Sequence, residues 1–200
     1  MTEQTLNKDF VLKILNKIEE TISRISNIID GLRSFAKDGS KDPFLPFKIA
    51  QLVEDTCHFC NERFKSNGID LTIEDFNHEL MVEGNVIELS QVLLNILNNA
   101  FDAVKEINVD HKWVKISVVV KDAYVEIHVT DCGNGITDNI QDKIFQPFYT
   151  TKEIGKGTGL GLSISLGIVQ KHAGSLKLNT QSAHTNFVIS LPLTPRSNRV

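Results

Sequence analysis

Apolar residues near the N-terminus recur at alternating steps of four and three. They are Val11, Leu15, Ile18, Ile22, Ile25, Ile29 and Leu32. A stripe with this spacing follows one side of an α-helix and forms the seam of a coiled coil. It predicts one long amphipathic helix over about residues 8–36, which needs a partner helix. The polar stretch that follows contains Gly39 and Pro43 and predicts a linker, so we divide the chain into residues 1–40 and 44–195.

The second part of the chain alternates between helical and strand-like patterns. Helices are predicted over residues 48–66, 85–106 and 160–172, and short strands at 71–73 and 79–82 (around a turn), 174–179 and 186–191. Apolar and polar residues alternate over 114–121 and 125–130, which predicts a hairpin with one buried face, joined at Lys121-Asp122-Ala123. The pattern as a whole predicts an α+β fold: a two-layer α/β sandwich with helices on one face of a mixed sheet, preceded by the long amphipathic helix.

Composition and charge narrow the class of protein. A content of 41% hydrophobic and 23% charged residues is typical of a soluble globular protein. The formal net charge of -4 argues against a nucleic-acid partner. Because no apolar run approaches the roughly 20 residues of a membrane span, and the N-terminus does not resemble a signal peptide, we expect a cytoplasmic segment without membrane contact. The full-length protein could still be attached to a membrane.

Cys57 and Cys60 form a C-x-x-C pair that resembles half of a metal site. Zinc normally requires four protein ligands, and no second pair follows in the sequence. The pair also lies within a predicted helix. We therefore expect two thiols that pack inside the protein, and three cysteines in total suit a reducing compartment.

A polar stripe interrupts the apolar helix predicted over residues 85–106. Asn95, Asn99 and Asp102 are spaced at i, i+4 and i+7, so their side chains share one face. Asparagine is a weak helix former, and amide oxygens suit a Mg2+ ion that is held partly by substrate phosphates. The alternative is a polar helix face turned toward water, and the stripe alone does not decide between the two.

Two glycine-containing loops could bind a ligand. Asp131 follows a predicted strand and precedes Gly133 and Gly135, a pattern in which a carboxylate can accept a hydrogen bond from an exocyclic amine while glycines admit a flat ring. The same pattern also describes ordinary turns.

The second loop, G-K-G-T-G-L-G over residues 155–161, leads directly into a helix and can cradle phosphates with backbone N–H groups. A flexible surface loop is the alternative, which the regular glycine spacing disfavours. The loop matches neither the Walker A nor the Rossmann pattern. Just upstream, Lys152 can reach toward a phosphate.

Four segments in order carry a resemblance to a known family: N-I-L-N-N-A-F-D-A, D-C-G-N-G, F-Q-P-F-Y-T-T-K and G-K-G-T-G-L-G-L-S. They resemble the N, G1, F and G2 boxes of sensor histidine kinases, which share an ATPase superfamily with gyrase, heat-shock chaperones and MutL proteins. The residues of L-L-N-I-L-N-N-A-F-D-A and P-F-Y-T-T-K are most similar to those of nitrogen-regulation-type kinases. The resemblance spans about residues 47–193 and implies a Bergerat ATP-binding fold with ATP and Mg2+ as cofactors.

The resemblance also implies roles for individual residues. Asn99, with Asn95 beside it, would be the catalytic Mg2+ ligand, and Asp131 would accept the adenine amine between Gly133 and Gly135. Residues 138–157 would form a mobile ATP lid. The remaining implied nucleotide-binding residues are Asp102, Ile136, Thr151, Lys152, Lys156, Gly157, Thr158, Gly159, Leu160 and Gly161.

The implied reaction is transfer of the ATP γ-phosphate to a histidine on a helical hairpin, for relay to an aspartate of a response regulator receiver domain. Residues 6–36 resemble the second helix of such a hairpin, so we expect a homodimer through this helix. None of the six histidines fits the phosphoacceptor pattern, and His111, His128, His172 and His184 are expected to be surface or sheet residues. The chain is therefore not expected to phosphorylate itself.

Two alternatives remain beside the kinase. A gyrase- or chaperone-like ATPase carries a glutamate at the position of Asn95, which activates water as a base. Asparagine cannot accept that proton, whereas phosphoryl transfer to imidazole needs mainly positioning and charge neutralisation. A nucleotide-binding pseudokinase scaffold that signals by dimerisation is the other alternative, and the intact Asn99, Asp131 and glycines argue against it.

Overall fold

The computed structural model describes residues 10–12, 14–15, 17–18, 21–22, 43–152 and 157–194. The described residues before position 23 are helical, and Leu15, Ile18 and Ile22 expose their side chains. They agree with the predicted N-terminal helix, the rest of which lies outside the described residues. Among the described helices, none is long and apolar enough to cross a membrane.

The second part of the chain folds into helices and strands that interleave. Their bounds are β1 Leu45–Lys48, α2 Ile49–Ser66, β2 Ile69–Ile73, β3 Met81–Gly84, α3 Val86–Lys105, β4 Lys112–Lys121, β5 Tyr124–Asp131, α4 Asp138–Gln141, α5 Gly161–Lys171, β6 Ser175–Leu178 and β7 Asn186–Pro192. The predicted helices and the predicted final pair of strands are confirmed, with ends that shift by one or two residues.

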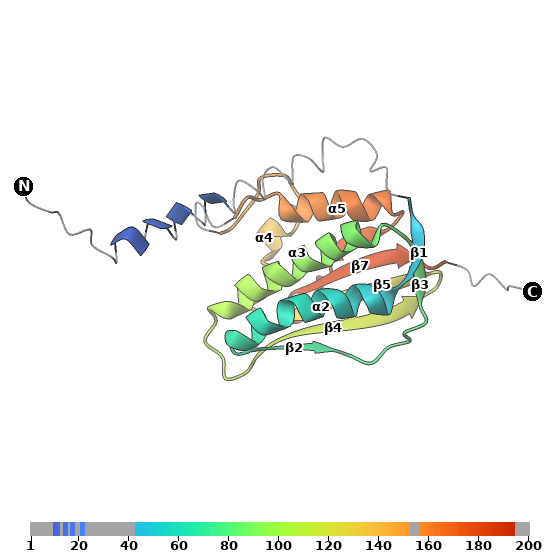
Figure 1. Cartoon of the computed structure of the whole chain (residues 1–200), viewed down its shortest axis with the longest axis horizontal. Helices are drawn as coiled ribbons and strands as arrows, with labels where there is room; N and C mark the ends of the chain where they lie inside the picture. The colour runs from blue at the N-terminus through green and yellow to red at the C-terminus, as the bar shows by residue number, and fades with distance from the viewer. Residues whose placement is uncertain are drawn as a thin grey trace, which may run out of the picture.

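The main sheet has five strands in the order β2-β4-β5-β7-β6. β2 runs parallel to β4, and the other neighbouring pairs are antiparallel, so the sheet is mixed as predicted. Helices α2, α3 and α5 lie together on one face of this sheet (Figure 1). The predicted two-layer sandwich is thus confirmed.

The β4–β5 hairpin is also confirmed. Lys121 pairs with Tyr124, which leaves Asp122 and Ala123 as a two-residue turn. Asp122 has a φ of 55°, the left-handed conformation that tight hairpin turns require and that aspartate tolerates.

Two expectations about strands were incomplete. The short strands predicted around a turn exist as β2 and β3, but they do not pair with each other. β2 pairs with β4, and β3 pairs with β1, a strand that the sequence did not predict. Pro46 weakens the strand pattern of β1, although proline is tolerated in an edge strand of this kind. The short polar helix α4 was not predicted either.

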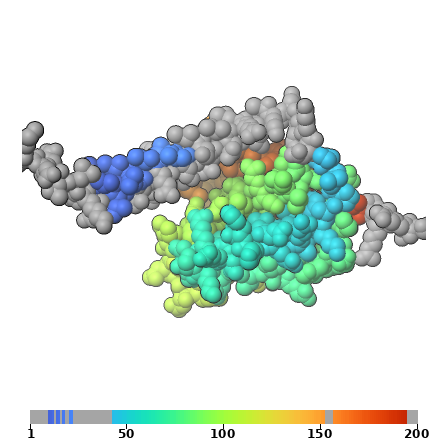
Figure 2. Space-filling view, viewed as in Figure 1, coloured from blue at the N-terminus to red at the C-terminus, as the bar shows by residue number. Residues whose placement is uncertain are grey.

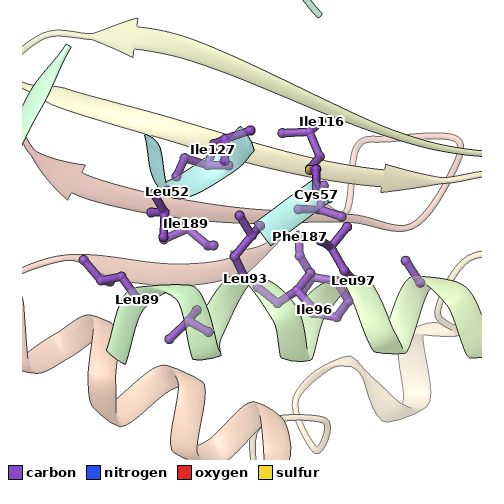
Figure 3. Close-up of a cluster of buried hydrophobic side chains, with 14 of the residues drawn as sticks. Leu52, Cys57, Leu89, Leu93, Ile96, Leu97, Ile116, Ile127, Phe187 and Ile189 are labelled. Carbon is purple, nitrogen blue, oxygen red and sulfur yellow. The ribbon is translucent and has the colours of Figure 1, made fainter. Parts of the chain in front are cut away.

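The core lies between the helices and the sheet. Figure 3 shows side chains from α2 and α3 that face side chains of the sheet; the labelled residues are Leu52, Cys57, Leu89, Leu93, Ile96, Leu97, Ile116, Ile127, Phe187 and Ile189. Each large aliphatic side chain buried in this way stabilises the fold by about 1.5–3 kcal/mol. Helix α2 lies at the molecular surface (Figure 2), so only its sheet-facing side contributes to this core.

The two cysteines of α2 belong to the core as well. Cys57 and Cys60 are buried, and burial raises the pKa of the Cys57 thiol to about 12. Because metals bind the thiolate, a thiol that stays protonated is a poor ligand. The pair therefore packs inside the protein, as expected.

The start of α3 is fixed by a histidine that was expected at the surface or in the sheet. His172 follows α5 and is only 3% exposed, so that expectation was wrong. Its Nε2 accepts the backbone N–H of Asn85 at 3.0 Å, and its Nδ1 donates to the carbonyl of Ile168 at 2.8 Å. Room for the ring exists because Gly84 has no side chain: a Cβ there would lie 2.5 Å from the imidazole Cδ2.

Candidate functional site

The polar face of α3 meets two other segments of the chain. Asn95 Nδ2 donates to Ser165 Oγ of α5 at 2.9 Å. Lys152 Nζ, from the segment before the glycine run, lies 3.3 Å from Asn99 Oδ1 and 2.5 Å from Asp102 Oδ2. This face is therefore not turned only toward water, because Ser165 and Lys152 contact it, while Asp102 stays exposed.

The described glycines of the run allow close packing. A Cβ on Gly161 would lie 2.4 Å from Asn95 Oδ1, and one on Gly157 would lie 2.6 Å from Thr150 Oγ1. Gly159 has a φ of +67°, and a Cβ there would lie 2.4 Å from the carbonyl carbon of Phe148. At each of these three positions a side chain would collide with a neighbouring residue, so the described glycines are closely packed. This argues against a flexible surface loop.

The other predicted residues of this run lie at the entrance to α5. Thr158 Oγ1 accepts the N–H of Leu160 at 3.4 Å, and Leu160 is buried immediately before the helix. Thr151 is exposed. Lys156 lies outside the described residues.

Asp131 forms the buried end of the site. It is 2% exposed, and its Oδ1 accepts the N–H of Gly133 at 2.8 Å. Burial raises its pKa to about 6, while hydrogen bonds from Gly133 and the Thr185 side chain and the proximity of His184 act in the opposite direction. A buried carboxylate with two donors can still accept from a third, such as an exocyclic amine.

Gly133 connects this end to α3. A Cβ on Gly133 would lie 3.6 Å from Cβ of Ala103, the residue after Asp102. Gly135 has a φ of +77° and no atom within 4 Å of the position of a Cβ, whereas Ile136 is half-buried and packs against the core. The structure therefore brings the Asp131 loop, the polar face of α3 and the glycine run to one region.

Sequence reasoning missed three contributors. Thr185 precedes β7 and is 7% exposed; nothing in its local sequence distinguishes it. Ser165 pairs with Asn95 only because α5 packs on α3. Arg63, in the last turn of α2, donates to Asn98 Oδ1 at 2.7 Å and lies 4.0 Å above the Phe101 ring. These are tertiary contacts without a sequence motif.

The residues fit a magnesium ion held together with a nucleotide. Asn95 and Asn99 supply two neutral hard oxygens, which is too few for a closed protein site but suits an ion that also binds phosphates. The Lys152 ammonium group beside Asn99 Oδ1 indicates that a positive charge is accommodated there. The glycine run and the N-terminus of the 11-residue helix α5 offer backbone N–H groups for the phosphates.

The sequence is similar to that of known proteins over most of its length. The family model of histidine kinase-, DNA gyrase B- and HSP90-like ATPases matches residues 84–195. The two-component sensor PprA of Pseudomonas aeruginosa is 31% identical over 196 residues, which cover 96% of this chain and 21% of PprA. The histidine-protein kinase AtoS of Escherichia coli is 28% identical over 200 residues, which cover 99% of this chain and 31% of AtoS. The chain thus spans about a fifth to a third of these relatives.

Solved structures of similar fold include two of the histidine kinase ThkA. Its nucleotide-free catalytic domain is 30% identical, with a TM-score of 0.67, and the match covers 77% of this chain and all of that domain. ThkA in complex with the response regulator protein TrrA is 26% identical, with a TM-score of 0.74, and covers 98% of this chain and 54% of that one.

Proposed function

The chain belongs to the family of histidine kinase-, DNA gyrase B- and HSP90-like ATPases, and from this premise we propose that it is the catalytic part of a sensor histidine kinase. It binds ATP with Mg2+ and transfers the γ-phosphate to a histidine on a helical hairpin. The observation that carries this proposal is the convergence of Asn95 and Asn99 with the glycine run, beside the buried Asp131. The nitrogen-regulation subgroup stays a prediction.

The adenine end is assigned to Asp131 and Thr185. The Asp131 carboxylate accepts the exocyclic amine, and the Thr185 hydroxyl holds the carboxylate in place. Gly133 shapes the adjoining wall, because any side chain there would collide with Asp131 Oδ1, at 2.7 Å from the position of a Cβ. Adenine is selected because guanine has a carbonyl oxygen in place of the exocyclic amine. Guanine would leave the buried Asp131 carboxylate without this donor, at a cost of about 1–3 kcal/mol in binding free energy.

The phosphate end is assigned to Asn99, Asn95, Lys152 and the glycine run. The two amide oxygens bind Mg2+, which neutralises charge on the phosphates. The backbone N–H groups of residues 157–161 and the Lys152 ammonium group orient the triphosphate. Asp102, Ile136, Thr151, Lys156, Thr158 and Leu160 complete the proposed nucleotide-binding set.

Kinase chemistry is favoured over hydrolysis by the side chain at position 95. Asn95 donates to Ser165 Oγ, and an amide cannot remove a proton from water. Transfer to an imidazole requires no such base, since the acceptor is itself a nucleophile. Positioning and charge neutralisation are sufficient.

Partners and domain organisation follow from the same proposal. Residues 1–40 form the second helix of a dimerisation hairpin, residues 44–195 form the catalytic domain, and the dimer places the domain near a phosphoacceptor helix. The receiver domain of a response regulator then takes the phosphoryl group, by analogy with ThkA, whose complex with TrrA has been solved.

Calorimetric titration of the chain with ATP and ADP, with and without Mg2+, tests the proposal. Asp131→Asn should remove binding, and Asn99→Ala should remove the Mg2+ dependence while weaker Mg2+-free binding persists. If the intact chain binds no nucleotide, the kinase proposal fails, and a scaffold that keeps the fold and signals by dimerisation without nucleotide takes its place. Transfer of radiolabelled phosphate from ATP to a separately supplied hairpin with its histidine is the second arm, and wild-type binding without any transfer would contradict the assigned activity.

A further inference from the structure

Asp102 lies between two cations that come from different segments. Its Oδ2 contacts Lys152 Nζ at 2.5 Å, and its Oδ1 lies 3.9 Å from Nη2 of Arg63. Asn99 Oδ1, one helical turn earlier on α3, is 3.3 Å from the same ammonium group. The carboxylate therefore holds a lysine directly beside the amide oxygen to which we assign Mg2+.

The Arg63 side of this arrangement is anchored. Its guanidinium group lies 4.0 Å above the Phe101 ring and donates to Asn98 Oδ1 at 2.7 Å. Phe101 in turn is buried against Phe64 of α2. Arg63 thus contacts Asn98 and Phe101 as well as approaching Asp102, whereas the second cation, Lys152, belongs to a loop.

The second cation, Lys152, packs against the glycine run. A Cβ on Gly157 would lie 3.3 Å from both Cβ and Cδ of Lys152. The aliphatic part of the lysine side chain therefore packs against the glycine run. The N–H of Lys152 donates to Thr150 Oγ1 at 3.2 Å. Holding the ammonium group on Asp102 thus also holds residues 150–152 and 157 against α3.

We propose that the Asp102–Lys152 ion pair is a latch that competes with nucleotide phosphate for Lys152. In the closed latch, Asp102 neutralises the lysine and keeps its segment on α3. An incoming triphosphate takes the ammonium group from Asp102, and the vacated side of Asn99 Oδ1 becomes available to the metal. Asp102 then belongs to the nucleotide-binding set only through Lys152, as a positioning residue, and it is not a metal ligand. This inference rests on the proposed function.

The exposure of the pair suits a latch that opens. The side chains of Lys152 and Asp102 are 34% and 40% exposed, and ion pairs accessible to water are weak. A triphosphate carries several negative charges and can displace one carboxylate. Removing the carboxylate should therefore raise the affinity for a nucleotide that arrives without Mg2+.

Nucleotide affinities of four proteins test the latch: wild type, Asp102→Asn, Lys152→Gln and the double variant. Asp102→Asn should bind Mg2+-free ATP about twofold to fivefold more tightly than wild type, and Lys152→Gln should bind it more weakly. In the Lys152→Gln background, Asp102→Asn should give little further gain, because the lysine is the group that it restrains. The Glu88→Gln variant is the matched control. Glu88 lies on α3, the helix of Asp102, and pairs with Lys171 of α5 at 2.9 Å, so its removal should leave affinity unchanged.

Each other outcome overturns the latch. If Asp102→Asn weakens only the binding of Mg2+-ATP, Asp102 is a metal ligand. If Asp102→Asn raises the affinity for Mg2+-free ATP equally in the Lys152→Gln background, the carboxylate merely repels phosphate. Hydrogen exchange of the nucleotide-free proteins separates this inference from the proposed function. Backbone amides around Lys152 should exchange faster in Asp102→Asn than in wild type, whether or not nucleotide binds, and equal exchange would refute the latch.

Discussion

At the scale of single residues, the buried carboxylate of Asp131 lowers the stability of the fold. Its pKa is raised from 3.8 to about 6, chiefly by burial. At about 1.4 kcal/mol per pKa unit, keeping this carboxylate ionised at neutral pH costs the folded state on the order of 3 kcal/mol. An acid with a raised pKa binds more protons when folded than when unfolded, so its contribution to stability falls as pH rises from about 4 to about 6. Such costs are typical of functional sites.

Asp131→Asn should therefore stabilise the nucleotide-free protein while it removes adenine recognition. The amide oxygen can still accept from the N–H of Gly133, and no buried charge remains. We expect a gain of about 1–3 kcal/mol in the free energy of unfolding at pH 7.5, measured by urea denaturation. Below pH 3.8 the carboxyl group is neutral in both states, so the difference should vanish; a variant less stable than wild type at pH 7.5 would show that the carboxylate is structural.

At the scale of elements, one imidazole joins three segments at the N-terminus of α3. His172 accepts from Asn85, whose side chain caps α3 by accepting the N–H groups of Ile87 and Glu88. The Phe44 ring, at the start of the domain, stacks on the imidazole at 4.4 Å with an interplanar angle of 14°. Helix α3, which carries Asn95 and Asn99, and helix α5, which follows the glycine run, are thus held together at the N-terminus of α3.

His172→Phe should preserve the stacking but leave the buried Asn85 N–H without an acceptor. The expected loss is about 1–3 kcal/mol in the free energy of unfolding, measured by chemical denaturation at pH 7.5. Phe44→Leu is the control that weakens the stack and keeps the hydrogen bond, and it should cost less. Equal losses in the two variants would mean that stacking, and not the hydrogen bond, is the main contribution.

The same histidine gives the fold a pH dependence of known sign. Burial lowers the pKa of His172 below its ordinary value of 6.5, with Glu88 opposing and Lys171 reinforcing the effect. Its neutral form is therefore favoured in the folded state, and its contribution to stability is complete above pH 6.5 and declines as pH falls below it. Wild type should lose stability in that range relative to His172→Phe, which has no group to titrate.

The glycine run is an element whose geometry depends on missing side chains. Gly161→Ala would place a methyl group 2.4 Å from Asn95 Oδ1 in the present conformation, so one of the two must move. We expect nucleotide affinity to fall by about tenfold or more, as a misplaced ligand or loop costs at least 1.4 kcal/mol. Gly167→Ala, on the same helix with nothing within 4 Å, is the matched control and should bind normally.

The accuracy of the sequence-based predictions follows from the range of the contacts involved. Local patterns were sufficient for the β4–β5 hairpin and for α3, because turn residues and periodicity act between near neighbours. Other features depend on partners far along the chain: the pairing of β2 with β4, the strand β1 and the burial of His172. Nothing in the sequence around Gly84 indicates that this glycine makes room for the imidazole ring. Within the site, the polar stripe and the glycines were visible in the sequence, while Arg63 and Thr185 became apparent only through packing.

At the scale of the whole molecule, the hydrophobic core of the described residues lies within residues 43–194. The exposed side chains of Leu15, Ile18 and Ile22 leave an apolar seam for a partner. Replacing Ile18 and Ile25 by aspartate should convert a dimer to a monomer in sedimentation experiments without changing nucleotide affinity. A dimer that survives both substitutions would place the interface elsewhere.

The order of strands in the main sheet also has a consequence for folding kinetics. β2 and β4 are parallel neighbours, yet β3 and α3 lie between them in the chain, and closing such a long crossover is slow. Trp113, the single tryptophan, lies in β4 opposite Asp70 of β2. Its fluorescence during refolding should therefore change in the slowest phase. Because α3 is part of that crossover, the capacity to bind nucleotide should appear with the same rate constant.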